Sequence, residues 1–178
     1  LSPSTTYKVK VKAVHTKYTE TEFSIASSAT TDAPSLTYDI DVSSSDSETG
    51  PPYTVNFGTL SPGSVTTATE KIWIDITTNG EGGGFVYLYN STGGLTSINA
   101  GYTIPSATAN LSSVSEGYGL QVATDTETSG GPLTAVTPYN GVSENVGVID
   151  TTARTIFTTN SAPISGGRGS IFVKAKSS

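Results

Sequence analysis

The chain has 178 residues, enough to bury one core of ordinary size, and its net charge is -6 with a pI near 4.6. Such a charge repels a phosphate backbone, so we expect no nucleic acid among its partners. Cys is 0, which excludes disulfides, thiolate metal sites and a cysteine nucleophile.

Short alternating runs of Val, Ile, Thr, Tyr and Phe recur between clusters of Gly, Pro, Ser and Asp, and helical periodicity is almost absent. This pattern predicts an all-β fold: an antiparallel β-sandwich, of jelly-roll or immunoglobulin-like type, preceded by a two-stranded hairpin. The expected domains are the hairpin, residues 1–33, and the sandwich, residues 34–178. We expect strands at residues 6–14, 23–31, 36–43, 53–58, 66–77, 84–90, 117–124, 145–149, 152–159 and 169–176.

The opening residues carry the spacing L-x-P-x-T-x-Y, formed by Leu1, Pro3, Thr5 and Tyr7. It resembles the tyrosine corner at the entry to the penultimate strand of fibronectin type III domains, and "SIASSATTDAP" is similar to their last strand. The resemblance implies that residues 1–33 are the final two strands of such a domain, with the phenol of Tyr7 bonded to backbone upstream.

Two explanations for this hairpin remain open, because an isolated two-stranded hairpin is at best marginally stable in water. Either the first five strands of the domain have been removed, or the hairpin completes the sheet of a neighbouring molecule by strand complementation. Head-to-tail contacts of the second kind do not close, so they build filaments. Val9 and Val11 form the inward face. The opposite face carries a basic row, which a solvated surface explains equally well: Lys8, Lys10 and Lys12.

Residues 70–76, "EKIWIDI", alternate clearly. The isoleucines share one face and are the expected core residues: Ile72, Ile74 and Ile76. Trp73 then lies on the charged face, where a loop, another sheet or a neighbouring molecule must cover it. A cover from the same chain is the more ordinary alternative.

Two later segments differ in their patterns. Residues 85–90, "FVYLYN", are apolar on both faces, which predicts a central strand buried on each side. Residues 91–116 have little strand pattern apart from "GYTIP", so we expect an extended surface excursion.

The last strand, "SIFVKAKSS", is expected to point Ile171 and Val173 inward and Lys174 and Lys176 outward. Such a terminal strand can close a sheet edge, where its lysines would discourage pairing with other molecules.

The region after residue 35 is loosely similar to β-sandwich domains of bacterial surface proteins of the WxL and spore-coat type. The similarity lies in "VNFGTLSPGSVTTATEKIWIDITTN" at 55–79, "GYGLQVAT" at 117–124 and "APISGGRGSIFVKAKS" at 162–177. It implies attachment or scaffolding at the cell envelope. The paired W-x-L motifs themselves are missing, so a peptidoglycan-binding role of that type is not supported.

Candidates for chemistry are few. The one histidine, His15, lies near the hairpin turn, where no catalytic triad can be assembled around it, so we expect no enzyme and no catalytic residue. Asp39 and Asp41 share a strand face near Asp46 and Glu48 and could bind Ca²⁺ through oxygen ligands, but a solvent-facing strand explains the same pattern. We therefore expect no metal and no cofactor.

Two glycosylation sequons occur, at Asn90 ("NST") and Asn110 ("NLS"). A chain this rich in Ser and Thr contains one or two sequons by chance, so chance explains them as well as glycosylation does. A glycan on either asparagine would mark a solvent-exposed face.

Composition places the protein outside the cell. Charged residues make up 13% of the chain, against about a quarter in ordinary domains. We expect an extracellular, cell-surface location and no membrane insertion in this segment, since no apolar run approaches the ~20 residues of a membrane helix.

The expected function is a structural one: a subunit or segment of a cell-surface filament or fibre, whose partners are copies of itself or neighbouring domains. The expected intermolecular contacts are Tyr7, Val9, Val11, Trp73, Ile171 and Val173. The alternative is a carbohydrate-binding module of a secreted protein, in which Trp73, Tyr87 and Tyr89 stack on sugar rings. A hydrolase is the weakest alternative, because it requires two acids facing a cleft.

Overall fold

The computed structural model describes residues 1–15 and 19–178. The chain divides into two compact units, Leu1–Ser35 and Leu36–Ser178. Regular structure is almost entirely β, and all its ladders are antiparallel, as the sequence predicts.

The first unit is a hairpin built from four strands: β1 (Thr6–Val9), β2 (Val14–His15), β3 (Thr19–Glu20) and β4 (Ser27–Thr30). β1 pairs with β4, with Tyr7 opposite Ala29, and β2 pairs with β3. The hairpin turn that was expected near His15 falls partly on residues 16–18, which lie outside the described residues.

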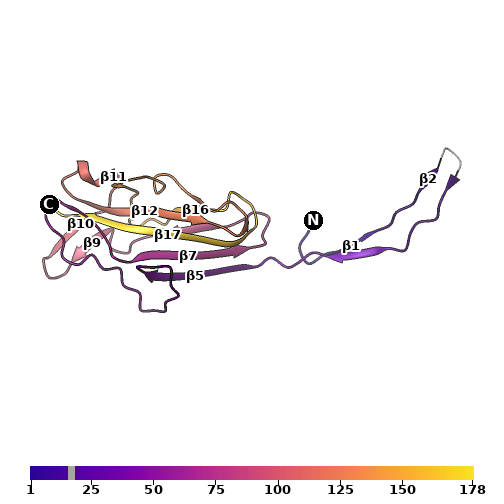
Figure 1. Ribbon diagram of the computed structural model, residues 1–178, viewed down its shortest axis with the longest axis horizontal. Coiled ribbons are helices and arrows are strands. Elements are labelled where there is room, and N and C mark those ends of the chain that lie inside the picture. The colour runs from indigo at the N-terminus through magenta and orange to yellow at the C-terminus, as the bar shows by residue number, and fades with distance from the viewer. Residues whose placement is uncertain (16–18) are drawn as a thin grey trace. The chain divides into compact units, whose positions relative to one another are not determined.

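The second unit contains two main sheets (Figure 1). The larger follows the order β12-β17-β7-β5, and β6 and β13 also pair with β17. The smaller follows the order β14-β16-β8. The strands of these sheets are β5 (Leu36–Ser43), β6 (Val65–Thr67), β7 (Lys71–Thr78), β8 (Phe85–Leu88), β12 (Gly117–Thr126), β13 (Ser129–Gly130), β14 (Thr134–Ala135), β16 (Arg154–Thr158) and β17 (Ile164–Lys176).

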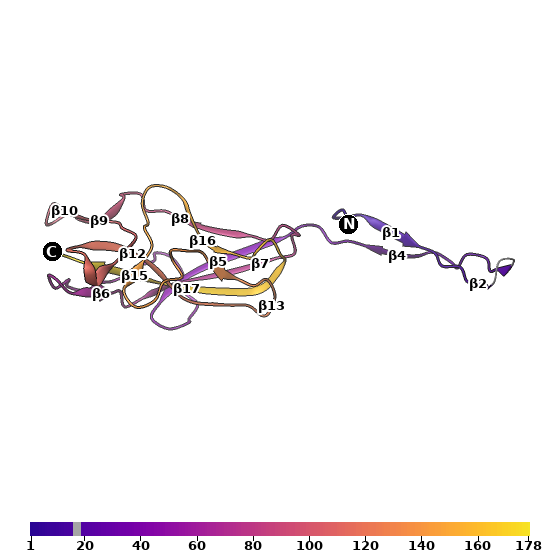
Figure 2. The same cartoon turned by 90° about the horizontal axis from the view of Figure 1, so that it is seen from above.

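One core joins these sheets. Ile74 and Ile171 from the larger sheet and Ile156 and Phe157 from the smaller are fully buried in the same cluster. Figure 2 shows β8 and β16 on one side of this unit and β7 and β17 on the other. The prediction for β7 is confirmed, because Ile74 and Ile76 are buried and Ile72 packs against the core.

The stretch 91–116 is largely exposed, as expected of a surface excursion, but it has more regular structure than its sequence pattern indicates. It contains the hairpin β9 (Gly94–Ser97) and β10 (Tyr102–Pro105), then β11 (Ala109–Asn110), which pairs with β15 (Asn145–Val146), and the 3₁₀ turn η1 (Leu111–Ser113). Ile104 and Leu111 are buried. Single apolar residues among many Ser, Thr and Gly anchor this segment, so no periodic run marks it. Conversely, the strand expected at 53–58 is irregular, although Val55 and Phe57 pack against the core.

Two strands have positions within their sheets that the sequence did not predict. β8 is at the end of the smaller sheet, and Phe85 and Tyr87 on its outer face are exposed, so the expectation of a strand buried on both faces was wrong. β17 is central rather than an edge, with β12 on one side and β7 and β6 on the other.

The lysines of β17 are buried, contrary to expectation. Lys174 Nζ donates to the carbonyl of Ser143 (2.5 Å) and lies 3.1 Å from Glu144 Oε2. Lys176 Nζ donates to the carbonyl of Val114 (2.7 Å). The loops that contain Val114 and Ser143 therefore cover this face of the sheet. Their carbonyl groups accept hydrogen bonds from the two ammonium groups, which need no solvent to be satisfied. Ile171 and Val173 point inward, as expected.

Candidate functional site

The hairpin unit begins with a closed corner. The backbone N–H of Ser2 donates to the phenol oxygen of Tyr7 (2.7 Å), and the hydroxyl of Thr31 donates to the carbonyl of Ser2 (2.6 Å). The N–H of Thr5 donates to the same Thr31 oxygen (3.0 Å). The expected bond between the phenol of Tyr7 and backbone upstream is therefore present, with Tyr7 as the acceptor.

Above this corner the hairpin exposes apolar side chains. Val9 is 62% exposed and Val11 67%, and Phe23 and Ile25 are exposed on the returning arm. Burying a side chain of this size stabilises a protein by about 1.5–3 kcal/mol. The described residues of this unit form no core that provides such burial. The apolar face of the hairpin therefore has no described residue of its own unit to pack against.

The backbone of the first arm also has an open side. Thr5, Val11 and Ala13 exchange hydrogen bonds with the returning arm through Thr31, Ser24 and Thr21. Backbone groups in an extended strand point alternately to its two sides, so the even-numbered residues between them direct theirs away from the returning arm. Lys8 and Lys10 are two such residues.

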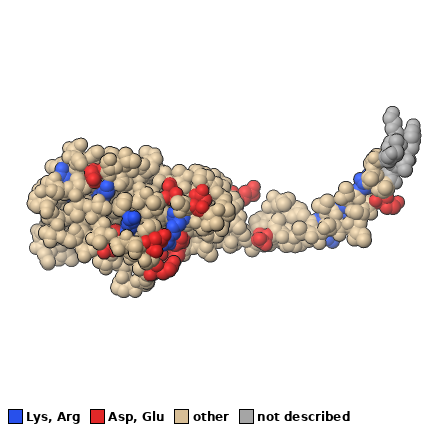
Figure 3. Space-filling view, viewed as in Figure 1, with Lys and Arg blue, Asp and Glu red and all other residues tan. Residues whose placement is uncertain are grey.

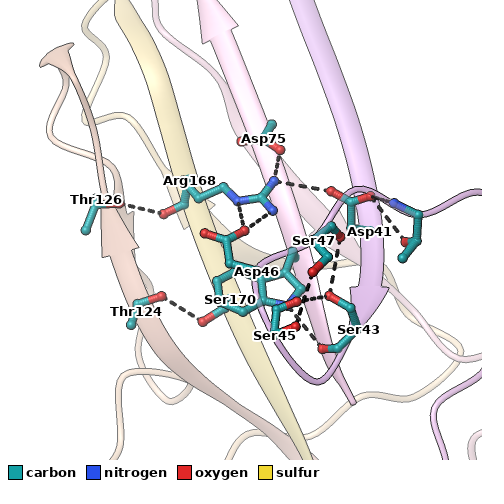
Figure 4. A network of polar contacts seen from close by, with 12 residues as sticks. Asp41, Ser43, Ser45, Asp46, Ser47, Asp75, Thr124, Thr126, Arg168 and Ser170 are labelled. Carbon is teal, nitrogen blue, oxygen red and sulfur yellow. Dashed lines mark hydrogen bonds and ion pairs between the residues drawn. The ribbon is translucent and has the colours of Figure 1, made fainter.

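The second unit carries a polar network on the outer face of the larger sheet (Figure 4). Strand register aligns its members, since Asp39 lies opposite Asp75, and Asp75 opposite Arg168. The guanidinium of Arg168 bonds to Asp41 (3.3 Å), Asp75 and Asp46. Figure 3 shows the acidic and basic side chains close together on this face.

Trp73 is part of this network and is only 7% exposed. Its indole N–H donates to the carbonyl of Ser43 (3.2 Å), and the cations of Lys71 and Arg168 each lie 5.2 Å from its ring centroid. Two cations at this distance gain from the electron-rich ring face. The expected cover from the same chain is thus confirmed.

The acids of the network can offer several oxygen ligands. One carboxylate oxygen from each of Asp39, Asp41, Glu48 and Asp75 lies within 4.8 Å of the others. Two of these four already bond to Arg168. The chain therefore supplies its own cation at the place where a metal ion would be coordinated.

Hydrogen bonds make Asp41 a stronger acid although it is fully buried. The backbone N–H of Thr49 (2.7 Å) has the largest effect in lowering the pKa of Asp41, and the Thr49 hydroxyl and Arg168 lower it further, against the rise that burial causes. Elsewhere, hydrogen bonds from Arg154 lower the pKa of Asp150 to about 2.

Three exposed aromatic residues occupy alternate positions along β8 and just after its end: Phe85, Tyr87 and Tyr89, here called the β8 stripe. Tyr87 is 56% exposed and Tyr89 65%, and the rings of Phe85 and Tyr87 lie 6.2 Å apart. Beside β8 is a cavity of about 390 Å³, lined largely by apolar side chains that include Val55, Phe57, Leu88 and Leu95. No sequence pattern distinguishes this stripe from a buried strand, because the run is apolar on both faces.

The predicted contact residues separate into two groups. Tyr7, Val9 and Val11 belong to the hairpin, and both valines are exposed. Contrary to expectation, three of them have little surface to offer another molecule, because they are buried within their own unit: Trp73, Ile171 and Val173. The reason is that β17 is a central strand, and that Trp73 is covered by Lys71, Arg168 and the end of β5 at Ser43.

Both sequon asparagines have local hydrogen bonds. Asn90 Nδ2 donates to the carbonyl of Gly94 (3.2 Å), and its Oδ1 accepts from Thr92 N–H (2.8 Å). Asn110 Oδ1 accepts from Ser112 N–H (3.0 Å) and caps η1. Asn110 thus leaves its amide nitrogen out of these bonds, whereas that of Asn90 is engaged. The side chain of His15 lies outside the described residues.

No helix among the described residues is long and apolar enough to cross a membrane. Comparison with family models, with curated proteins and with solved structures finds no match for this chain.

Proposed function

We propose that this chain is an extracellular structural protein, a subunit or segment of a cell-surface filament or fibre, whose hairpin pairs with a sheet of another molecule. One observation carries the proposal: the hairpin exposes an apolar face, centred on Val9 and Val11, that no described residue of its unit covers. A partner sheet gives that face a core and extends its hydrogen bonding.

The low share of charged residues supports an extracellular setting. Pairing between strands is directional and long-lived, and a donor and an acceptor at different places on one molecule build an open chain of subunits.

Light scattering and electron microscopy over a concentration series test this proposal. We expect particles that grow with concentration and that disappear in the double variant Val9→Asp, Val11→Asp. The matched control is Val142→Asp, a change of an exposed valine in the second unit, which should assemble normally. A wild-type protein that stays monomeric at every concentration contradicts the proposal.

A second candidate function is carbohydrate binding, and the β8 stripe is the observation that favours it. Exposed aromatic rings in a row can stack on the apolar faces of sugars. The stripe has two threonines beside it, since Thr155 is opposite Tyr87 and Thr158 opposite Phe85. Trp73 no longer supports this candidate, because it is buried. Retention on insoluble polysaccharide that Tyr87→Ala abolishes, and that Tyr38→Ala on β5 does not, would establish it.

A further inference from the structure

We infer that the acceptor for the hairpin is the open edge of β8 in a second copy of this chain, with Lys10 directly opposite Tyr87 in an antiparallel ladder. This inference rests on the proposed function and specifies its contact.

β8 has one paired and one open side. Gly84 and Asn90 bond to the β16 side, through Thr159 and Asp150. By the alternation of backbone groups, the odd-numbered residues of β8 direct their N–H and C=O groups to the other side. In the described part of the chain, β8 pairs with no strand there.

The edges of the larger sheet are better protected. On β5, the N–H of Val42 donates to the Thr49 hydroxyl and the carbonyl of Ile40 accepts from the Tyr53 phenol. On β12, Leu120 exchanges two backbone hydrogen bonds with Gly147. Both strands thus bond to the chain's own loops, which is how native sheets block pairing with other molecules.

One register between the first arm of the hairpin and β8 aligns both the outward backbone groups and the side chains of the two edges. On the first arm of the hairpin, the residues with outward backbone groups include Lys8 and Lys10, and on the β8 side they are the aromatic residues of the stripe. In an antiparallel ladder, residues whose backbone groups face each other are directly opposite, with their side chains on one face. Lys10 opposite Tyr87 therefore places Lys8 opposite Tyr89.

This register joins chemically complementary groups on both faces. On the outer face, ammonium groups meet exposed aromatic rings, which attract cations through their electron-rich faces. On the inner face, Val9 lies opposite Leu88 and Val11 opposite Val86. The side chain of Leu88 lines the apolar cavity beside β8, so the valines would extend the core on that side.

Net charge favours the same contact. The hairpin unit has four lysines and three acidic residues, so its net charge is +1. Because the whole chain has a net charge of -6, residues 36–178 have a net charge of -7. Two hairpins would gain nothing from each other's lysines, whereas a hairpin and the second unit of another copy attract.

Engineered cysteines test the register without background, because the chain has no Cys. Lys10→Cys protein is mixed with Tyr87→Cys protein under mild oxidation, and the control mixture pairs Lys10→Cys with Tyr38→Cys, an exposed tyrosine of β5. We expect disulfide-linked dimers of the first pair to form about tenfold faster or more than those of the control, because residues directly opposite bring Cβ atoms to ~4.5–5.5 Å. Fluorescence of Trp73 verifies that each variant is folded.

A charge reversal gives a second measurement. Lys8→Glu with Lys10→Glu should weaken self-association by about ten- to a hundredfold, since two cation–ring contacts are lost. Assembly that persists while the first pair links no faster than the control overturns the β8 register but leaves the proposed function standing. Monomers at every concentration overturn both. Two further outcomes also overturn the inference. In a variant that carries both Lys10→Cys and Tyr87→Cys, a disulfide within one chain would show that β8 binds the hairpin of its own molecule. Loss of disulfide linking on addition of polysaccharide would show that β8 binds sugar.

Discussion

The hairpin and β17 contain the same alternation of lysine with small apolar residues, yet the surroundings of these residues differ completely between the two regions. In β17, Val173 is buried between two sheets and Lys174 reaches the carbonyl of Ser143. In the hairpin, Val9 and Lys10 are both exposed. Alternation therefore specifies two unlike faces, but burial depends on neighbours that the pattern does not describe. The hairpin has the alternation of a covered strand, but no described residue of its own unit covers its apolar face.

The largest expected difference between the two regions concerns their apolar residues. Ile171→Ala should lower the free energy of unfolding of the second unit by about 2–5 kcal/mol, because it leaves a cavity in a closed core. Val9→Ala should change it by less than about 0.5 kcal/mol, because Val9 is exposed. Urea unfolding followed by Trp73 fluorescence in dilute protein measures both. A large effect of Val9→Ala under these conditions would mean that the hairpin is covered within its own molecule.

The lysines provide a second, smaller contrast. Lys174→Met should cost about 1.5–3 kcal/mol, because it removes the charge-assisted hydrogen bond from the buried Lys174 to the carbonyl of Ser143 and the ion pair with Glu144. Lys10→Met should leave unfolding of the dilute protein unchanged. The same urea experiment measures the pair, and equal effects would show that the hydrogen bonds of the Lys174 ammonium do not stabilise the second unit.

The strand pattern predicted much of the second unit and little of its network. Ile74 and Ile76 were identified because period-two alternation applies within one strand. Arg168 was missed because it lies in "SGGRG", which reads as a turn, and its partners Asp41 and Asp75 come from other strands. Only the register between strands brings these three together. The position of β8 was missed for a similar reason, since a run that is apolar on both faces does not reveal how many neighbours the strand has.

Acid should destabilise the second unit more than the hairpin corner, which contains no titrating carboxylate among its bonds. The folded-state pKa of Asp41 lies below the ordinary value of 3.8, so its contribution is complete above that pH and is lost as pH falls through the lowered pKa. The contribution of Asp150 to stability is likewise lost as pH falls toward its pKa of about 2. This contribution is smaller, because the ion pair of Asp150 with Arg154 is partly exposed.

Urea unfolding from neutral pH down to about 2 measures this dependence. Asp41→Asn should be less stable at neutral pH and should flatten the curve below pH 3.8, whereas Asp150→Asn should flatten it only slightly. An unchanged slope in Asp41→Asn would place the acid sensitivity elsewhere in the network.

The smallest effect is expected at the corner of the hairpin. Tyr7→Phe removes the acceptor for the N–H of Ser2 and keeps the ring, so global unfolding of the second unit should not change. Locally, the loss of one exposed hydrogen bond, about 0.5–1.5 kcal/mol, should speed amide exchange at Ser2 and Thr5, and more so in dilute protein than in assembled protein. Exchange at Leu120 is the internal control, since its hydrogen bonds lie in the second unit. If Tyr7→Phe leaves exchange at Ser2 unchanged, the phenol does not close the corner. The order of the hairpin then comes from the pairing of its two arms alone.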